Sequence, residues 1–413
     1  MPERDSVRPR PYARPEALVV GAGPVGCLIA GILARHGYQV VVCEQRPHFI
    51  EKGIAEEGRT INLSLSPRGM SVLIAQGCAV HLKDFVVGMG ARVVHPRHGS
   101  ARRTAYGKPE WQNFSVSRRE LNRVLMRDAV NRPNVHIEFD MRCAAIDFTR
   151  REAKFVTRQE GEIYISYDLL VGADGATSQV RNELSRQGLT QSRLRRLNAT
   201  YKEFELRSGA GMAESDWAAI HVWPRNGFFL VALPNVDGSL RATLVISDGH
   251  AEHFSKLLTS AALTAFFRRH FPDSVESLRP VTEREALRRP APLLTASCSA
   301  LTYQDSVLLV GDAAHTVAPF LGQGINLGFE DCGVLDQLLS APSHSLSDLL
   351  RDYGQRRKQA GDAASDLSLA NFAELTEVRR LRTGTPLPVL VNFLGLSYEE
   401  VLRRYSGGSG LYR

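Results

Sequence analysis

The segment spanning residues 18–44, LVVGAGPVGCLIAGILARHGYQVVVCE, constrains the fold of this chain more than any other. A short apolar run leads into a turn containing Gly21, Gly23 and Gly26, which is followed by an apolar stretch of helical length. A second apolar run then ends at Glu44. A G-x-G-x-x-G turn between a strand and a helix, with an acidic residue about 20 positions later, is typical of dinucleotide-binding βαβ units. The sequence therefore predicts such a unit here.

Each residue of this pattern has an expected role. Gly21 permits the tight turn, Gly23 lets the backbone approach a pyrophosphate, and Gly26 lets the helix pack closely on the strand. The unpaired N–H groups at the helix N-terminus face the phosphates. Glu44 is expected to accept a hydrogen bond from the adenosine ribose. Arg46, two residues later, is also predicted to bind the cofactor.

A membrane-spanning or secretory segment is the main alternative for the same stretch. Residues 17–34 carry no charge and are about long enough to span a bilayer. Pro24 and four glycines argue against that alternative, because proline lacks an N–H group and each interior glycine costs a helix about 1 kcal/mol. With no long apolar run near the C-terminus either, the sequence predicts a soluble, cytoplasmic protein without a signal peptide or membrane anchor.

Composition limits the kinds of ligand that the chain can bind and the cellular compartment that it suits. The 413 residues suit two interleaved domains. A formal net charge of +7 favours anionic ligands, but no basic, aromatic-interleaved tract indicates a nucleic acid partner. The six cysteines are scattered and form no C-x-x-C pair, which is typical of reduced thiols in the cytoplasm and predicts no metal site.

Two further apolar strands run into acidic turns. Residues 167–171 lead into Gly-Ala-Asp174-Gly, and residues 307–310 lead into Gly-Asp312. Ligands of open α/β sheets bind beyond the carboxyl ends of strands, so both aspartates are candidate ligand contacts, although Asp174 could also serve only a turn. The helix expected over 325–339 follows three residues whose backbone can face an anion or a polarised ring: Gly322, Gln323 and Gly324.

Residues 201–247 change to alternating, aromatic-rich runs separated by glycine turns, which predicts antiparallel hairpins and a second sheet. Trp223, Phe228 and Phe229 could line an apolar pocket or simply fill the core. Arg118 begins a predicted helix, where it could bind a pyrophosphate or remain an exposed first-turn arginine.

Three separated signatures stand in order along the chain: G-A-G-P-V-G with Glu44, G-A-D-G at 172–175, and G-D-A-A-H at 311–315. Together they resemble the flavoprotein aromatic hydroxylases with a single FAD-binding domain, of the p-hydroxybenzoate hydroxylase type. Within that class the chain is most similar to the kynurenine 3-monooxygenases, from about residue 18 to residue 405. The resembling stretches are residues 58–69, 105–122, 221–235, 310–332 and 365–375.

The resemblance implies an α/β architecture with discontinuous domains. A Rossmann-like FAD-binding domain of the glutathione-reductase type is expected over residues 17–80, 111–180 and 296–340. It is interleaved with an antiparallel-sheet substrate domain over 81–110 and 181–295, and a helical region follows over 341–413. Residues 1–16, with four arginines and four prolines among them, are predicted to form a flexible tail.

By position, the resemblance also implies roles for individual residues. Arg118 is expected to contact the FAD pyrophosphate and Asp312 the ribityl chain. The substrate's amino-acid carboxylate is expected to be held by Arg92, Tyr106, Asn371 and Tyr398, with charge-assisted hydrogen bonds from the arginine. The aromatic ring pocket is expected to be lined by Phe228, Pro319 and Phe320.

The implied reaction uses NAD(P)H and O2 to hydroxylate L-kynurenine, or a ring-substituted kynurenine, ortho to its aromatic amine through a flavin C4a-hydroperoxide. No general base is expected, and NADPH is expected to dock transiently because no second G-x-G-x-x-G unit follows. Two alternatives stay open: a hydroxylase of another phenol or quinolone, and an uncoupled NADPH oxidase or flavin sensor. The sequence also leaves open whether the enzyme uses NADPH or NADH. The oligomeric state is open as well, and a dimer is one possibility.

Overall fold

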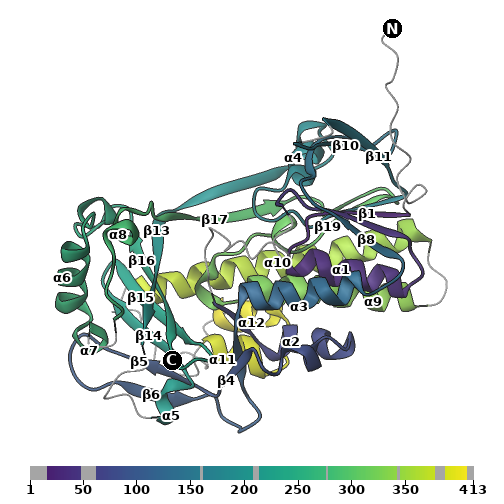
Figure 1. The fold of residues 1–413 in the computed structure, drawn as a ribbon. Helices are drawn as coiled ribbons and strands as arrows, with labels where there is room; N and C mark the ends of the chain where they lie inside the picture. Colours follow the sequence, from purple (N-terminus) through teal and green to yellow (C-terminus); the bar gives the residue numbers. More distant parts are fainter. Residues whose placement is uncertain are drawn as a thin grey trace.

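The structure is a computed structural model that describes residues 16–47, 62–158, 161–207, 214–275, 278–341, 345–376 and 387–406. Within these ranges a six-stranded and a seven-stranded sheet lie at opposite ends of the molecule, and helices cover their faces (Figure 1). Two three-stranded sheets complete the architecture. The predicted α/β class is confirmed.

The six-stranded sheet contains the predicted dinucleotide-binding unit. Its strand order is β18-β19-β12-β1-β2-β8, and all neighbours are parallel except β18 and β19. Parallel strands covered on both faces are expected to be continuously apolar, as β1 is. The strands are β1 (Ala17–Val20), β2 (Val40–Cys43), β8 (Val135–Glu138), β12 (Leu169–Gly172), β18 (Thr302–Tyr303) and β19 (Val307–Leu309).

The two faces of this sheet enter different cores, because successive side chains of a strand point to opposite sides. Ala17 and Val19 pack with α1, α3 and α9, whereas Leu18 and Val20 pack with α4 and a small antiparallel sheet. The helices are α1 (Pro24–Arg35), α3 (Arg118–Val130), α4 (Gln179–Arg186) and α9 (Gly324–Ser340). The small sheet contains β9 (Arg142–Asp147), β10 (Glu152–Val156) and β11 (Glu162–Ser166).

The seven-stranded sheet has the order β17-β13-β16-β15-β14-β5-β6. The antiparallel pairs predicted within residues 201–247 are confirmed, and the β5–β14 pair is the parallel one. β13 and β17 extend from this sheet toward the six-stranded unit (Figure 1). The strands are β5 (Ala91–Val94), β6 (Arg102–Ala105), β13 (Ser192–Leu206), β14 (Ile220–Arg225), β15 (Phe228–Pro234), β16 (Leu240–Ser247) and β17 (Ala291–Cys298).

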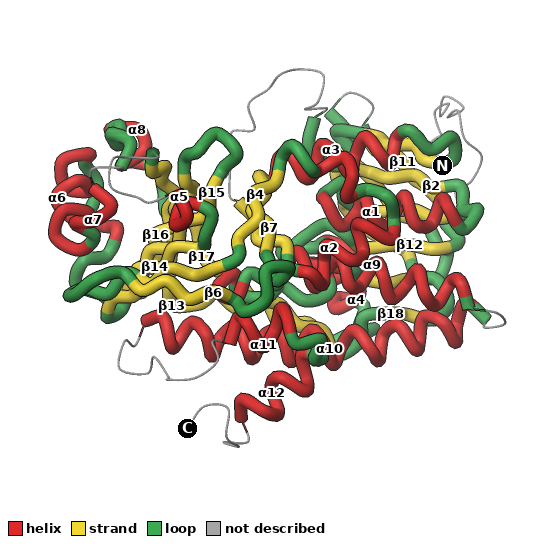
Figure 2. The backbone as a smooth tube through the Cα atoms, turned by 90° about the horizontal axis from the view of Figure 1, so that it is seen from below, coloured by secondary structure: helices red, strands yellow, loops and turns green. Residues whose placement is uncertain are grey.

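Helices cover both faces of the seven-stranded sheet. The outer face packs with α6 (Ser260–His270), α7 (Pro272–Val275) and α8 (Glu283–Leu287). The inner face packs with η4 (Pro319–Leu321) and with the long helix α10 (Leu346–Thr376). Figure 2 shows α10 running past both large sheets, in agreement with its contacts to β14, β15, β17 and β18.

The remaining elements lie between the large sheets and along α10. The second small sheet has the order β3-β7-β4, with β3 (Asn62–Leu65), β4 (Val86–Met89) and β7 (Asn113–Ser117). The helices α2 (Pro67–Ala75), α11 (Leu387–Phe393) and α12 (Tyr398–Ser406) lie near α9 and α10. Shorter turns are η1 (Ala79–Leu82), α5 (Glu214–Trp217), η2 (Phe254–Lys256) and η3 (Gly311–Ala313).

Some sequence expectations fall outside what the structure describes. The predicted tail over residues 1–16 and the first part of the 58–69 stretch lie almost entirely in undescribed ranges. The proposed domain boundaries stay a prediction. Within the described ranges, every helix is too short or too polar to cross a membrane.

Candidate active site

The glycine turn between β1 and α1 is built as its sequence requires. Gly21 has a φ of +102°, and a Cβ atom there would lie 2.6 Å from the carbonyl oxygen of Ala173. A Cβ atom on Gly26 would lie 1.9 Å from the carbonyl oxygen of Gly21. At Gly23, by contrast, a Cβ atom would meet nothing within 4 Å. The close packing therefore fixes Gly21 and Gly26, and the space beside Gly23 is open to a ligand.

The N-terminus of α1 is available to an anion. Its N-cap residue Gly23 offers no side-chain hydrogen bond, and the first turn contains no acidic side chain. The first backbone N–H groups of a helix lack partners within the helix and carry a partial positive charge, so they suit a phosphate. This geometry supports the predicted pyrophosphate contact.

Glu44 follows β2 and lies beside the turn. One carboxylate oxygen accepts from the Ala22 backbone N–H at 2.8 Å, and the other accepts from the backbone N–H and Nε of Arg46, each at 2.9 Å. Burial alone would raise the pKa of the Glu44 carboxyl, but hydrogen bonds and charge from Arg46 hold that pKa below its ordinary value. Glu44 is therefore an ionised acceptor in a fixed position, and Arg46 is the residue that fixes it.

Asp312 and Arg118 each follow the carboxyl end of a strand, β19 of the six-stranded sheet and β7 of the second small sheet. Asp312 follows β19 in η3, and its side chain is exposed. Its carboxylate lies 3.8 Å from the position that a Cβ atom on Gly324 would occupy. Arg118 is exposed at the first position of α3, as predicted, and is the strongest positive charge acting on Asp312. The predicted pyrophosphate and ribityl contacts therefore lie within one region.

Asp174 serves its own turn. Its carboxylate accepts from the Ser178 hydroxyl at 2.5 Å and from the backbone N–H groups of Gln179 and Val180 at 2.6 and 3.2 Å. These bonds hold the start of α4. Asp174 therefore stabilises its own turn, which was one of the two roles that the sequence allowed. A direct contact from Asp174 to the cofactor stays a prediction.

Sequence reasoning missed Arg181, which joins the two acidic turns. This buried arginine of α4 donates to the carbonyl oxygens of Ala176 at 2.5 Å and of Ala313 at 3.1 Å. It thereby connects the turn after β12 with η3. The signal in the sequence was a charged residue inside the predicted helix that follows G-A-D-G.

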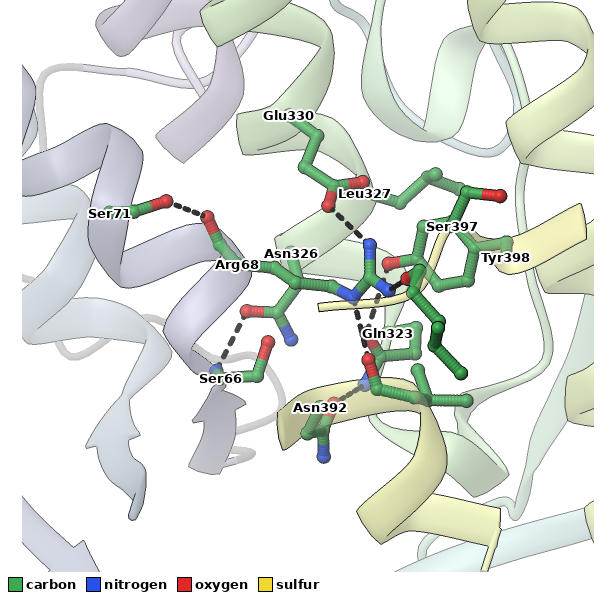
Figure 3. Close-up of polar contacts among 12 residues, drawn as sticks. Ser66, Arg68, Ser71, Gln323, Asn326, Leu327, Glu330, Asn392, Ser397 and Tyr398 are labelled. Atoms are coloured by element: carbon green, nitrogen blue, oxygen red, sulfur yellow. Dashed lines mark hydrogen bonds and ion pairs between the residues drawn. The ribbon is translucent and has the colours of Figure 1, made fainter. Parts of the chain in front are cut away.

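Gln323 and Tyr398 bind each other. The Tyr398 hydroxyl donates to Gln323 Oε1 at 3.0 Å, and Gln323 Nε2 donates to Asn392 Oδ1 at 2.9 Å and to the Leu321 carbonyl at 3.1 Å (Figure 3). Both side chains are buried. Because these bonds use both amide hydrogens of Gln323 and the hydroxyl hydrogen of Tyr398, the pair supports the loop before α9, where Gly322 takes a φ of +66°.

Arg92 and Tyr106 carry buried polar atoms that lack hydrogen-bond partners in the part of the chain that the structure describes. The unbonded atoms are Nε of Arg92, on β5, and the hydroxyl of Tyr106, just after β6. The Oδ1 atom of Asn113, which lies beside Tyr106, is also unbonded. Buried polar atoms are almost always paired in native proteins. Burial raises the pKa of Tyr106 to about 12, so its phenol keeps a proton to donate. These donors fit a carboxylate ligand.

Helix α10 brings Asn371 and Glu374 to this region. Asn371 Nδ2 donates to the Phe320 carbonyl at 2.8 Å, so this side chain fixes η4, and its contact with a substrate stays a prediction. Burial lowers the pKa of Arg92, and the negative charge of Glu374 opposes that shift. Glu374 was missed by the sequence analysis, although its position three residues after Asn371 places both on one helix face.

The aromatic wall differs from the prediction. Phe320 of η4 stacks on Phe372 with ring centroids 4.2 Å apart, and its ring lies 5.7 Å from that of Phe229. Phe228 instead packs on the outer face, 5.4 Å from Phe266. The expectation that Phe228 lines the same wall as Phe320 is therefore wrong, because adjacent residues of a strand point to opposite faces. Pro319 begins η4 and is exposed.

These features fit FAD. The open helix N-terminus suits its pyrophosphate, Glu44 suits its adenosine ribose, and Asp312 lies beside the second helix N-terminus, that of α9. The fold and site thus define an FAD-binding α/β protein. Of the described residues, no group of His, Cys, Asp and Glu could hold a metal ion.

Comparison with known proteins extends this conclusion. Residues 14–368 match the family described as FAD binding domain. The chain is 34% identical over 361 residues to a kynurenine 3-monooxygenase of Legionella pneumophila (strain Corby), covering 86% of this chain and 79% of that protein. It is 40% identical over 375 residues to a kynurenine 3-monooxygenase of Salinispora arenicola (strain CNS-205), covering 89% and 82%.

Solved structures show the same fold at lower identity. The tetrameric form of 2-methyl-3-hydroxypyridine-5-carboxylic acid oxygenase has a TM-score of 0.73 at 20% identity, covering 91% of this chain and 94% of that one. PqsL of P. aeruginosa, in complex with 2-aminobenzoylacetate, has a TM-score of 0.72 at 21% identity, covering 89% and 98%. The chain belongs to the FAD-binding family and, within it, to the kynurenine 3-monooxygenases. It is an FAD-dependent monooxygenase.

Proposed function

We propose that this enzyme hydroxylates L-kynurenine, or a ring-substituted kynurenine, ortho to the aromatic amine, with NADPH and O2 as co-substrates. The observation that carries the proposal is the pair of buried donors, Arg92 Nε and the Tyr106 hydroxyl, which have no hydrogen-bond partner among the described residues. The relatives of Legionella and Salinispora, named kynurenine 3-monooxygenases, support the same substrate.

The buried Nε of Arg92 argues for a substrate with a carboxylate. A buried N–H group without an acceptor is costly, so this nitrogen favours a ligand that accepts a hydrogen bond and brings negative charge. In the proposal, Arg92 and Tyr106 bind the carboxylate of the amino-acid tail. The negative charge of Glu374 suits the α-ammonium group of the same tail.

The aromatic side chains hold the other end of the substrate. Phe229, Phe320 and Phe372 form a cluster in which each ring contacts the other two. Such a cluster can pack against an aniline ring and exclude water. Bound FAD supplies the activation of O2, and the protein supplies orientation and a dry environment.

No dedicated base is required from the protein. The aromatic amine of kynurenine already donates electrons to its ortho carbon, so the substrate does not need to lose a proton before it is hydroxylated. The contribution of the chain is then to hold the ring at a fixed distance from the flavin, which alone lowers the barrier substantially.

The compartment and the rival functions follow from the same observations. All six cysteines are buried thiols, which supports a reducing cytoplasm as the location. A phenol or quinolone substrate without an amino-acid tail would leave the two buried donors without a ligand. An uncoupled oxidase would have no need of such donors.

The test compares ligands that differ only in the tail. NADPH consumption and hydroxylated product are measured with L-kynurenine, with 2-aminoacetophenone, which lacks the amino-acid tail, and without ligand. We expect rapid NADPH consumption matched by product only with L-kynurenine. Equal NADPH consumption in all three reactions, with H2O2 as the product, would support the oxidase instead. Hydroxylation of the tail-free ketone at the same rate would remove the carboxylate clamp.

A further inference from the structure

Arg68 on the first turn of α2 reaches across to the C-terminal segment. Its Nε donates to the Val391 carbonyl at 2.7 Å, one terminal nitrogen donates to the Leu396 carbonyl, and the other donates to Glu330 at 2.9 Å. Its guanidinium carbon lies 4.3 Å from the centre of the Tyr398 ring. Figure 3 shows the guanidinium between Glu330 of α9 and Tyr398 of α12.

The two carbonyl groups that Arg68 binds lie on either side of Phe393, in α11 and in the turn after it. Val391 is in the last turn of α11, where a carbonyl has no donor within the helix. The Phe393 ring lies 4.9 Å from the Tyr106 ring and 5.6 Å from the Trp111 ring. Arg68 therefore fixes the turn that holds Phe393 against the proposed carboxylate clamp.

The same segment also contacts the loop before α9. Asn392 Oδ1 accepts a hydrogen bond from the Gln323 amide nitrogen, and the Tyr398 hydroxyl donates one to the Gln323 amide oxygen. Residues 391–398 thus contact Tyr106 on one side and Gln323 on the other. The substrate clamp and the flavin loop are connected through a segment that Arg68 holds.

An ordinary ion pair with Glu330 would not require this geometry. Such a pair uses one nitrogen of the guanidinium, whereas here the other two nitrogens donate to main-chain carbonyls of a different segment. A planar guanidinium can serve three acceptors spread in one plane, and a lysine ammonium cannot match that arrangement.

We propose that Arg68 is a positioning residue for the hydroxylation. By holding residues 391–398 it fixes Phe393 against Tyr106 and Tyr398 against Gln323, so the substrate ring keeps one distance from the flavin. This inference rests on the proposed function, because the ligand of the clamp is taken to be the carboxylate of the substrate.

The test uses Arg68→Met, Arg68→Lys and a matched control, Arg35→Met. Arg35 makes an ion pair with Asp336 of α9 at 2.7 Å, as Arg68 does with Glu330, and no bond to the C-terminal segment has been identified for it. Four quantities are measured in the purified holoenzyme: FAD content, the KM for L-kynurenine, product formed per NADPH, and hydrogen exchange of residues 387–406.

Both Arg68 variants are expected to keep FAD and to lower product per NADPH. The KM should rise about tenfold, which corresponds to about 1.4 kcal/mol of substrate binding. Exchange of residues 387–406 should become faster in these variants only. Wild-type values of KM and product per NADPH in Arg68→Met would overturn the inference, and so would equal losses in Arg35→Met.

A second variant keeps the test decisive if the Arg68 variants do not fold. Phe393→Leu leaves Arg68 in place and is expected to show the same rise in KM and the same loss of product per NADPH. An unchanged KM in Phe393→Leu would contradict the inference. If the wild-type enzyme forms no product from L-kynurenine, the proposed function fails and the role of Arg68 in hydroxylation fails with it, whereas the exchange measurement still shows whether Arg68 holds residues 387–406.

Discussion

His95 and His221 share a hydrogen bond, with 3.0 Å between Nε2 of His95 and Nδ1 of His221. His221 Nε2 lies 2.8 Å from the carbonyl oxygen of Asp216, which can only accept, so the proton of His221 is on Nε2. His221 Nδ1 must then accept from His95. Nδ1 of His95 lies 2.6 Å from the Asp273 carboxylate. His221 is therefore neutral, and it accepts a hydrogen bond from His95.

This arrangement predicts a specific loss of stability at acid pH. Burial, followed by the charge of His95, lowers the pKa of His221 from 6.5 to about 4. The unfolded chain takes up this proton near pH 6.5, before the folded protein does, so stability falls as the pH falls from 6.5 to 4. The shift corresponds to a loss of about 3 kcal/mol over that window.

The measurement is the free energy of unfolding at several pH values for the wild type, His221→Gln and His136→Gln, a control in an exposed side chain of β8. We expect a shallower pH dependence between pH 6.5 and 4 in His221→Gln only. If the free energy of unfolding depends on pH in the same way in all three proteins, His221 does not cause the loss of stability at acid pH.

Arg92→Ala is expected to weaken substrate binding without loss of FAD. Removing one partner of a buried charge pair costs at least about 2 kcal/mol, which is about 30-fold in the dissociation constant. Binding is measured through the change in flavin absorbance on titration with L-kynurenine. Arg102→Ala, on the exposed strand β6, is the matched control and should bind as the wild type does. An unchanged constant in Arg92→Ala would remove Arg92 from the substrate site.

Phe228 and Phe229 provide a matched pair of variants on one strand. Both side chains are buried, and replacement by leucine should cost each protein about 1 kcal/mol of stability. Only Phe229→Leu removes a contact to Phe320, so only this variant should change the KM for L-kynurenine and the product formed per NADPH. A larger kinetic effect from Phe228→Leu would place the substrate ring on the outer face of the sheet.

Alanine variants of Gly23 and Gly26 distinguish an effect on cofactor binding from an effect on folding. Gly26→Ala places a Cβ atom 1.9 Å from a backbone oxygen, so the variant should be strongly destabilised and should contain little FAD. Gly23→Ala meets no protein atom within 4 Å and should fold with a cost of about 1 kcal/mol, yet bind FAD more weakly. FAD content and thermal unfolding of the apoprotein distinguish the two. Full FAD affinity in Gly23→Ala would contradict the assigned pyrophosphate position.

The sequence predicted those parts of the site that depend on neighbouring residues. The turn with Gly21, Gly23 and Gly26 could be read because its strand, turn and helix are contiguous and its spacing is set by local geometry. The start of α3 at Arg118 and the hairpins of β14, β15 and β16 were predicted for the same reason. The role of each predicted residue toward FAD and substrate stays a prediction.

The parts that the sequence could not supply depend on packing between distant segments. Alternation along β15 places Phe228 and Phe229 on opposite faces, but which face meets Phe372 depends on where α10 packs. The hydrogen bond between Gln323 and Tyr398 joins residues 75 positions apart, and no local pattern indicates it. Arg68 was hidden for the same reason, since its main-chain partners Val391 and Leu396 lie more than 300 positions away.

The most direct test of the account is a turnover experiment under isotopically labelled O2, with L-kynurenine and NADPH, followed by mass spectrometry of the products. The account predicts a hydroxylated kynurenine that carries one labelled oxygen atom, in an amount close to the NADPH consumed. Consumption of NADPH with all of the label in H2O2 and none in an aromatic product would contradict it.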